Sequence, residues 1–484
     1  MKFKYLSMLM LGASLTGLTA CNDFLDKMPE SAVTPDAYFM AEADLAAYSI
    51  NLYNFNTIPT GQYGLSVFAD NNHTDDQVAM NSSTRWVPGQ WLVGSSTSDD
   101  KRGEAWNFFQ IRDCNYFLDQ VLPKYEAGQI TGSEANIRHY IGEVYMLRAY
   151  AYFQKLQDIG DCPIIETALP DVEETLVEAS KRRPRHMVAR FILSDLDKAI
   201  SFLSDKTPGG KNRISKDAAY LLRSRVALYE GTWLKHHDGT AFVPGGPGWP
   251  GSDSEGYNAQ TEISYFLGEA MKSAKVVGDK MVGNLVNNTD TPEGMSPALV
   301  SINPYYTMFC DNDMEGYSEV LLWREYSQSL GITHNLQKEA QHSGGGTGYS
   351  RGLVNSFLMR NGLPIYAAGS GYDPEWEKQG VAATLQDRDS RIQLFTKKDG
   401  DVESYLTDGT FTTVDFNWVV NGNNETRMTT GFAIKKGKHY DVYQQITHHV
   451  GTTGSLVFRG TEAMLNYMEA CYELNGSIDA TADG

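Results

Sequence analysis

The sequence predicts a mainly α-helical protein, with paired helices in its first half and many loops in its second half. Three observations favour this class. Apolar residues recur at spacings of three and four in several segments before residue 237, and turn sequences separate these segments. A stretch rich in glycine and proline then interrupts the pattern. The composition, 41% hydrophobic and 21% charged, is typical of a globular chain and not of a disordered one.

The first 20 residues have the organisation of an export signal. Lys2 and Lys4 give a positive start, and residues 5–18 form an apolar core that is short for a membrane-spanning helix. The sequence LTAC then ends in Cys21, which resembles the lipobox of bacterial lipoproteins, in which the cysteine is acylated. The alternative is an ordinary secretory signal with a chance cysteine. We exclude residues 1–20 from the fold and predict that Cys21 carries the lipid anchor.

Four segments show the helical period most clearly. Ser215 is placed to cap the start of the last of them. Turns at 128–132 and 208–211 divide the segments into pairs, the pattern of stacked hairpins in tetratricopeptide-type repeats, although no clean repeat of about 34 residues is visible. The predicted helices are residues 103–122, 134–158, 186–203 and 216–234.

The second half is expected to be mixed. Residues 238–258 contain too many glycines and prolines for a helix or a central strand, and are predicted to be a surface loop. Apolar runs at 320–323 and 431–434 are consistent with short strands. The resulting division is a signal at 1–20, a helical region at 21–237, a loop-and-helix insertion at 238–284 and a C-terminal region at 285–484.

Helical spacing returns at residues 461–474 and stops at Asn475-Gly476. A single amphipathic helix needs a partner that covers its apolar face, and only ten residues follow this one. We therefore expect the C-terminal region to be incomplete, lacking a portion that would finish the last hairpin. The apolar face consists of Met464, Leu465, Met468 and Tyr472.

Charge and cysteine spacing disfavour several functions. The formal net charge of −19 opposes nucleic-acid binding, and the one basic run, at 181–185, is expected to be a solvated loop. No two cysteines have the C-x-x-C spacing of a zinc or thioredoxin site. Cys114 and Cys471 lie on apolar faces of predicted helices and are expected to be small buried residues. The disulfide state of these two, Cys162 and Cys310 is left open.

Six motifs follow one another along nearly the whole chain. They are GEVYMLRAYAYFQKLQDIGDCPII (142–165), ILSDLDKAISFL (192–203), NRISKDAAYLLRSRVALYEGTW (212–233), LVNSFLMRNGLPI (353–365), DRDSRI (387–392) and FRGTEAMLNYMEACYELNG (458–476). Together with the lipobox they resemble the SusD/RagB family of Bacteroidota lipoproteins. Ser390 stands where that family usually has proline. The third motif resembles the family segment in which small residues let two helices pack closely.

The resemblance implies an α-helical, tetratricopeptide-containing lipoprotein on the outer face of the outer membrane. Such proteins sit on a SusC-like TonB-dependent transporter, capture oligosaccharides or sometimes peptides, and act as a lid during import. They are not catalysts. The implied partners are the transporter, an oligosaccharide and the membrane. The alternatives left open are a helical-repeat scaffold for a protein partner and a peptide-binding uptake lipoprotein.

A sugar site needs an aromatic platform for the apolar face of the ring, flanked by amides or charged groups. The polar stretch 69–91 fits best, because the family places an aromatic residue here after an element like the TDD at 74–76. We predict Trp86 as the platform, with Arg85 and Asn81 beside it; the alternative is that Trp86 and Trp91 pin the loop to the body. The other candidates are Trp91, Trp249, Tyr305, Tyr306 and Trp376.

One segment resembles a hydrolase motif and another a calcium-binding loop, but neither meets the full requirements of its site. GYSRG at 348–352 fits G-x-S-x-G, and Asp389 and His439 follow, but no buried strand precedes the serine, so Ser350 is predicted to cap a helix. Residues 311–316 begin like a calcium loop, yet Leu322 occupies the required acidic position. We expect no catalysis, metal or cofactor, with adventitious calcium as the alternative.

Overall fold

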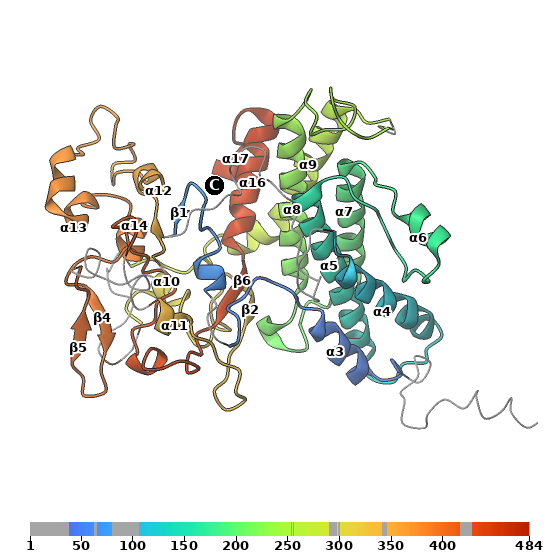
Figure 1. Ribbon diagram of the computed structural model, residues 1–484, viewed down its shortest axis with the longest axis horizontal. Helices are drawn as coiled ribbons and strands as arrows, with labels where there is room; N and C mark the ends of the chain where they lie inside the picture. The colour runs from blue at the N-terminus through green and yellow to red at the C-terminus, as the bar shows by residue number, and fades with distance from the viewer. Residues whose placement is uncertain are drawn as a thin grey trace, which may run out of the picture.

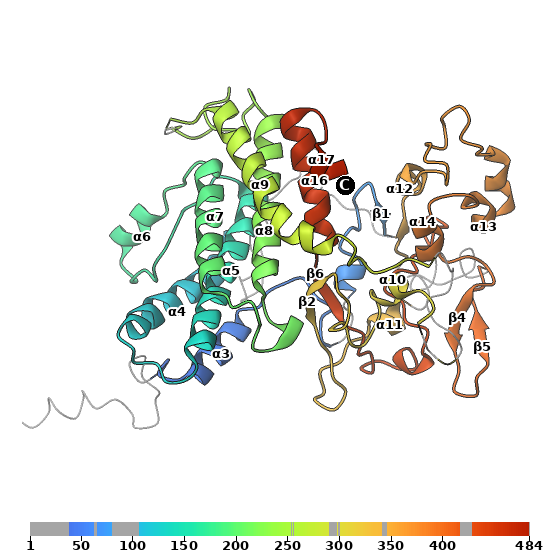
Figure 2. The same cartoon turned by 180° about the vertical axis from the view of Figure 1, so that it is seen from behind.

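A half built from packed helices lies beside a loop-rich half with short helices and strands (Figure 1). Figure 2 shows the two halves from behind, and the segment that follows α3 (Glu42–Asn51) crosses from the first half to the second. This computed structural model describes residues 38–61, 65–79, 106–252, 254, 256–289, 298, 301–340, 346–416 and 428–483.

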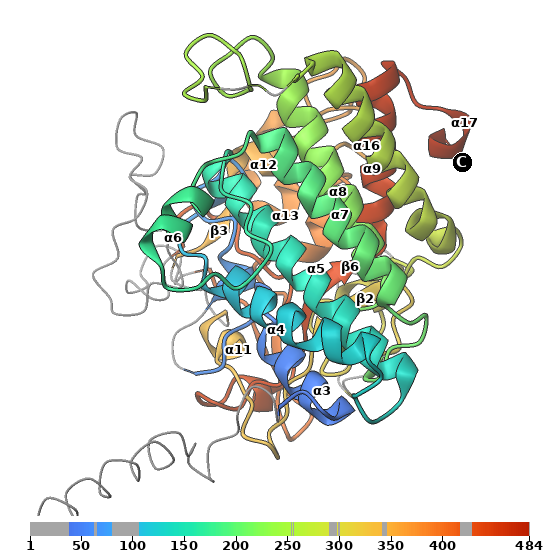
Figure 3. The same cartoon turned by 90° about the vertical axis from the view of Figure 1, so that its right-hand side faces the viewer.

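The helical half is a side-by-side stack in which each helix packs on the next. Figure 3 shows the order α4, α5, α7, α8, α9, α16, so the last helix of the stack comes from the far end of the sequence. The members are α4 (Phe109–Glu126), α5 (Glu134–Ile159), α7 (Arg185–Phe202), α8 (Lys216–His236), α9 (Ala259–Met281) and α16 (Thr461–Asn475), with α6 (Glu173–Ala179) and α17 (Ala480–Asp483) at the margins.

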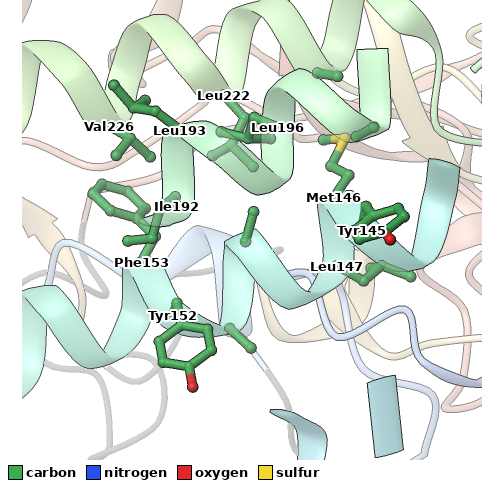
Figure 4. Close-up of a cluster of buried hydrophobic side chains, with 14 of the residues drawn as sticks. Tyr145, Met146, Leu147, Tyr152, Phe153, Ile192, Leu193, Leu196, Leu222 and Val226 are labelled. Carbon is green, nitrogen blue, oxygen red and sulfur yellow. The ribbon is translucent and has the colours of Figure 1, made fainter. Parts of the chain in front are cut away.

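The core of the stack forms around α5, which is covered by α4 on one side and α7 on the other. Apolar side chains of α5, α7 and α8 interdigitate there, as Figure 4 shows for Phe153, Ile192 and Leu222. Two buried ion pairs cross the same contacts: Arg148 with Asp195 joins α5 to α7. Arg185 with Glu230 joins α7 to α8. Apolar burial drives the packing, and the paired charges fix which helix faces meet.

Glycines allow the closest approaches between these helices. A Cβ atom on Gly142 would lie 2.9 Å from the backbone nitrogen of Leu203, and one on Gly231 would lie 2.8 Å from Leu267 Cδ2. Gly231 belongs to the motif in which the family resemblance implies close helix packing. The α8–α9 contact therefore depends on the missing side chain.

Replacing Gly231 by leucine is expected to lower the free energy of unfolding by about 1–3 kcal/mol, because the added carbons must push α8 and α9 apart. Gly268 on α9 is the matched control. No atom lies within 4 Å of a Cβ built there, so Gly268→Ala is expected to be neutral or to stabilise by up to about 1 kcal/mol. Urea denaturation of both variants measures the difference; equal stability for the two would contradict the close contact.

Among its described residues, the loop-rich half has three two-stranded antiparallel sheets: β1 with β3, β2 with β6, and β4 with β5. The β2–β6 sheet lies next to the stack, and α16 follows β6 directly.

The strands are β1 (Gln77–Val78), β2 (Val320–Arg324), β3 (Gly348–Tyr349), β4 (Val402–Tyr405), β5 (Phe411–Thr413) and β6 (Ser455–Arg459). The α-helices are α10 (Pro304–Thr307), α11 (Leu336–Glu339), α12 (Arg351–Ser356), α13 (Val381–Thr384) and α14 (Ser390–Phe395). The 3-10 helices of the described chain are η1 (Ser66–Phe68), η4 (Pro374–Gln379) and η5 (Val442–Gln444) here, and η3 (Gly210–Asn212) before α8.

The helices predicted at 134–158, 186–203, 216–234 and 461–474 are confirmed within a few residues, whereas the one predicted at 103–122 is displaced along the chain to Phe109–Glu126. Ser215 caps α8 as expected, since its hydroxyl accepts a hydrogen bond from the backbone N–H of Ala218 at 3.1 Å. The run at 320–323 is a strand, whereas the run at 431–434 makes only isolated bridges, from Ala433 and Ile434. The helix expected within the insertion at 238–284 is α9, and it is a full member of the stack.

The last helix is covered on one face only, and this is not the apolar face named from the sequence; that the C-terminal region is incomplete stays a prediction. α16 packs on α9 and α8 through a face that includes Ala463, Ala470 and Cys471. Glu462 accepts two hydrogen bonds of 2.6 Å from Arg225 of α8. The side chains named as its apolar face are instead largely exposed: Leu465 is 57%, Met468 40% and Tyr472 59% exposed.

The four cysteines of the described chain are free and buried, which confirms the prediction for Cys114 and Cys471. Burial raises the pKa of the Cys162 thiol to about 12, so this group stays protonated and unreactive at neutral pH. Of the helices that the structure describes, none combines the length and the apolarity that crossing a membrane would need.

Candidate functional site

A cavity of about 410 Å³ lies in the loop-rich half, and we call it the central cavity. Its wall includes residues of the segment that crosses from the helical half after α3 (52–61 and 65–79), which we call the crossing segment. The other wall residues come from β3, α12, α14 and the start of β6, so residues separated by almost 400 positions meet there. The volume is within the usual range for a small-molecule site. It is lined by Ile58, Val67, Phe68, Asn71, Gln77, Phe309, Leu336, Tyr349, Leu353, Phe357, Arg391, Ile392, Phe395, Ile434, Lys436, Gly437, Gly454, Ser455 and Leu456.

The crossing segment is fastened to the opposite wall by hydrogen bonds. The N–H of Ile58 donates to Ser455 Oγ at 3.1 Å, and Asn72 Nδ2 donates to Thr347 Oγ1 at 3.1 Å. Gln77 pairs with Tyr349 in the β1–β3 sheet. A glycine is required at 454, because a Cβ there would lie 2.7 Å from the ring of Trp323. The cavity is therefore formed by tertiary contacts between distant segments.

The lining carries the groups that a sugar needs. Phe309, Phe357 and Tyr349 are half-buried and present aromatic surface to the cavity. Asn71 contributes an exposed amide, and Arg391 and Lys436 contribute charged donors. Aromatic faces can take the apolar faces of sugar rings, while amides and cations can bond the hydroxyl rims. The arrangement suits reversible binding of a polar ring compound.

Two cations are held against aromatic rings at this site. Lys436 Nζ lies 4.3 Å from the ring centroid of Phe309, and the Arg391 guanidinium carbon lies 5.9 Å from that of Phe357. Arg391 is also paired with Asp389, with Nη2 2.6 Å from Oδ2. These contacts restrain both long side chains, so a ligand need not order them fully on binding.

The sequence-predicted residues are only partly brought together. Trp86, Arg85, Asn81 and Trp91, like the lipidation residue Cys21, lie outside the described residues. The described part of the predicted stretch, 69–79, does contribute Asn71 and Gln77 to the cavity. Tyr305 stands at its border, half-buried, with its ring 5.5 Å from Phe309 and 5.7 Å from Phe395.

Two other predicted residues lie elsewhere. Trp249 is half-buried beside the helical stack, where its indole N–H donates to Asp161 Oδ2 at 2.8 Å. Trp376 lies on η4, and its ring centroid is 5.6 Å from that of Tyr372. Neither residue lines the central cavity.

The prediction for Tyr306 is wrong. Its side chain is fully buried, and its hydroxyl donates toward the backbone oxygens of Lys438 and Lys435, at 2.7 and 3.1 Å. The ring stacks on Tyr440 with centroids 5.5 Å apart. Tyr306 therefore packs the interior of the loop-rich half and is not accessible to a ligand.

The hydrolase-like residues do not form a triad. Ser350 Oγ accepts from the N–H of Leu353 at 3.0 Å, which confirms it as a helix cap, and Asp389 pairs with Arg391. His439 Nδ1 accepts from the N–H of Asp441 at 3.0 Å. In the calcium-like segment, Asp311 Oδ2 accepts from the Tyr317 hydroxyl at 2.7 Å. The described ranges contain no group of three or more histidine, cysteine or acidic side chains placed to hold a metal.

Two buried histidines near the cavity are expected to make the fold acid-sensitive. Burial lowers the pKa of His334 and of His439 to about 4 each. Both stay neutral in the folded protein, whereas the unfolded chain takes up protons below about pH 6.5. Stability should therefore be full above about pH 6.5 and fall as the pH drops toward 4, by a few kcal/mol in total.

Urea midpoints between pH 7.5 and 4.5 measure this loss. His439→Asn is the informative variant, since its Oδ1 can replace Nδ1 as the acceptor for Asp441 without titrating. We expect a shallower pH dependence in that variant. A wild-type midpoint that is constant from pH 7.5 to 5 would contradict the buried neutral histidines.

Three other hollows in the described part of the chain are comparable in size, including one of about 340 Å³ beside Asn54 and Gln110. Another, of about 510 Å³, lies between Phe55, Arg324 and the hairpin at Leu330. The third, of about 390 Å³, lies beside α4 and is lined by Trp106 and Phe109, which are 43% and 49% exposed. We call the third the Trp106 groove; it is the main rival as an aromatic platform. Its described lining contains one cation, Arg112, and none of the described residues 69–79 of the predicted stretch; Arg182 lies over the Trp106 ring at 5.4 Å.

The sequence patterns do not single out most of the cavity. Phe309, Phe357 and Phe395 sit in segments without clear periodicity, and Lys436 follows an apolar run that resembles a strand. Arg391, Leu353 and Phe357 could have been named from the sequence, because they belong to the motifs DRDSRI and LVNSFLMRNGLPI. The rest required knowing which distant segments meet.

Comparison with known proteins matches two family models to the chain. One, described as "Starch-binding associating with outer membrane", matches residues 23–228, and the SusD family model matches residues 314–483. Two curated SusD-like proteins of Formosa agariphila are similar. One is 26% identical over 226 residues, covering 44% of this chain and 41% of the relative. The other is 24% identical over 251 residues, covering 47% and 44%. The matches thus span less than half the length of these relatives.

Solved structures agree with the fold. A SusD-like protein from Bacteroides fragilis superposes with a TM-score of 0.58 at 21% identity, covering 92% of this chain and 78% of that one. A SusD-like carbohydrate binding protein from the same species gives 0.57 at 16% identity, covering 92% and 76%. At these identities the likeness concerns the fold alone. With the two SusD family models matching residues 23–228 and 314–483 in chain order, the chain belongs to the SusD/RagB family.

Proposed function

We propose that the protein captures oligosaccharides in the central cavity and passes them to a SusC-like TonB-dependent transporter, while a lipid on Cys21 holds it at the outer membrane. The observation that carries this proposal is the cavity itself, where half-buried aromatic rings stand beside an amide and two cations. The family description and the carbohydrate-binding neighbour support the ligand class. The transporter, the anchor and the surface location rest on the family resemblance.

The mechanism is equilibrium binding, in which no covalent bond of the ligand changes. A sugar ring would lay its apolar face on Phe357 or Tyr349, and its hydroxyls would exchange water for the Asn71 amide and the Arg391 guanidinium. Burial raises the pKa of the Tyr349 phenol above its usual value, so its hydroxyl is neutral and can donate. Moderate affinity suits the role, because the ligand must leave again for the transporter.

Calorimetric titration against a panel of oligosaccharides and peptides tests the proposal. The wild type is expected to bind at least one oligosaccharide class, and Phe357→Ala to weaken that binding by about tenfold or more through loss of a stacking ring. Trp106→Ala is the matched control, since it removes an aromatic ring from the rival groove. Phe242→Ala is a second control: it removes a ring that is 61% exposed on the loop of the helical half and lines neither hollow, so it should leave binding unchanged.

Other outcomes separate the alternatives. Loss of binding in Trp106→Ala but not in Phe357→Ala would move the site to the Trp106 groove. Binding of peptides and of no oligosaccharide would favour a peptide-uptake lipoprotein. Absence of both kinds of binding, with capture of a protein partner by the helical stack, would favour the scaffold.

A further inference from the structure

The charges that line the central cavity differ from those of the chain as a whole. The protein carries 60 acidic and 41 basic residues, a net charge of −19. The charged residues among the described lining are nevertheless Arg391 and Lys436, both cations, with no carboxylate beside them in that lining. A positive cavity in an acidic protein concentrates the field on whatever enters it.

Lys436 is the cation without a counter-charge. Arg391 is neutralised by Asp389, which accepts from both Nε and Nη2. In the part of the chain that the structure describes, no carboxylate lies within ion-pair distance of Lys436. Its ammonium instead rests on aromatic rings, 4.3 Å from the centroid of Phe309 and 5.5 Å from that of Phe395.

A further cation, Arg459, shares one of these rings, that of Phe309. Its guanidinium carbon lies 5.2 Å from the centroid of Phe309 and 5.9 Å from that of Tyr305. Its own carboxylate partner, Glu319, is buried and stands at 3.6 Å. Lys436 is exposed on one side; loss of water on its other side and the charge of Arg459 lower the pKa of its ammonium below its usual value. An anion bound beside Lys436 would relieve this unfavourable positive charge.

We propose that the central cavity prefers acidic oligosaccharides, those with carboxylate or sulfate groups, over neutral ones of the same backbone, and that Lys436 binds the anionic group. The inference rests on the proposed function, since it names the substrate class for the same cavity. The aromatic rings would take the sugar faces, as for a neutral glycan. The ammonium, a mobile point charge on a flexible stem, would take the carboxylate or sulfate.

Matched ligand pairs test the preference. An oligogalacturonide is compared with its carboxyl-reduced form, and a chondroitin sulfate oligosaccharide with its desulfated and carboxyl-reduced form, by calorimetry at low and high salt. We expect at least one acidic member to bind about tenfold or more tightly than its neutral partner, with the gap shrinking at high salt because bound charges are screened. Lys436→Gln should remove the gap, and Lys436→Arg should retain most of it.

Lys378→Gln serves as the surface control, because Lys378 is exposed on η4 and pairs with Glu375 outside the cavity. If neutral oligosaccharides bind as well as or better than acidic ones, the preference is wrong while glycan capture stands. If the gap persists in Lys436→Gln, the assignment to Lys436 is wrong. If no oligosaccharide of either charge binds, glycan capture and the preference both fail.

Discussion

Replacing Asp195 by alanine is expected to lower the free energy of unfolding by about 3–5 kcal/mol. Asp195 is fully buried and accepts from Arg148 Nε at 2.7 Å and Nη2 at 2.8 Å. The guanidinium is itself 3% exposed and also donates to Asn115 Oδ1 at 2.8 Å. Removing the carboxylate leaves a buried positive charge without its counter-ion in the contact between α5 and α7. Guanidinium chloride denaturation measures the loss.

An exposed pair in the same half provides the comparison. Asp279 is 58% exposed and pairs with Lys275 at 2.9 Å, so Asp279→Ala is expected to cost less than about 1 kcal/mol. Asp195→Asn should fall between the two, since it keeps the shape and one acceptor but loses the charge. A cost for Asp195→Ala as small as that for Asp279→Ala would show that the buried pair does not stabilise the stack.

Replacing Val67 by tryptophan is expected to weaken glycan binding about a hundredfold, which corresponds to about 2.7 kcal/mol. Val67 lines the central cavity from η1 and is 39% exposed, so a larger side chain there can enter the cavity without displacing core residues. An indole would occupy the space that a sugar ring needs. Calorimetry gives the affinity, and the thermal midpoint should stay within a few degrees of wild type.

Val177→Trp is the control for that experiment. Val177 is 65% exposed on α6 and does not line the central cavity, so the same enlargement should leave binding unchanged. Undiminished binding by Val67→Trp, with the protein folded, would remove the central cavity from consideration as the site.

The helical half was predictable from sequence because its information is local. Spacings of three and four located α4, α5, α7 and α8, and Ser215 marked a helix start. The motif residues Arg148 and Asp195 lie in segments recognised for the family, and the structure shows that they bond to each other. The sequence did not indicate which second face of the last helix would be buried, because that face is made of small and polar residues such as Ala463, Asn466 and Ala470, which carry a weak apolar pattern.

The candidate site was less predictable, because it depends on contacts between segments far apart in sequence. Ile58 bonds Ser455, and Gln77 pairs with Tyr349, and no spacing rule reveals either contact. Tyr305 and Tyr306 are neighbours of the same type, yet one borders the cavity and the other is buried in the core. Side-chain chemistry alone makes both tyrosines candidates for ligand binding, and only the fold shows which of them is accessible.

Hydrogen–deuterium exchange with a bound oligosaccharide from the titration panel tests the central claim most directly. The account predicts slower exchange on binding in segments 66–79, 348–357, 391–395 and 434–437, which line the central cavity. The helical stack, including residues 106–115 beside the Trp106 groove, should be unchanged. Protection confined to 106–115 and 165–176, with none at the cavity segments, would contradict the claim that the central cavity is the glycan site.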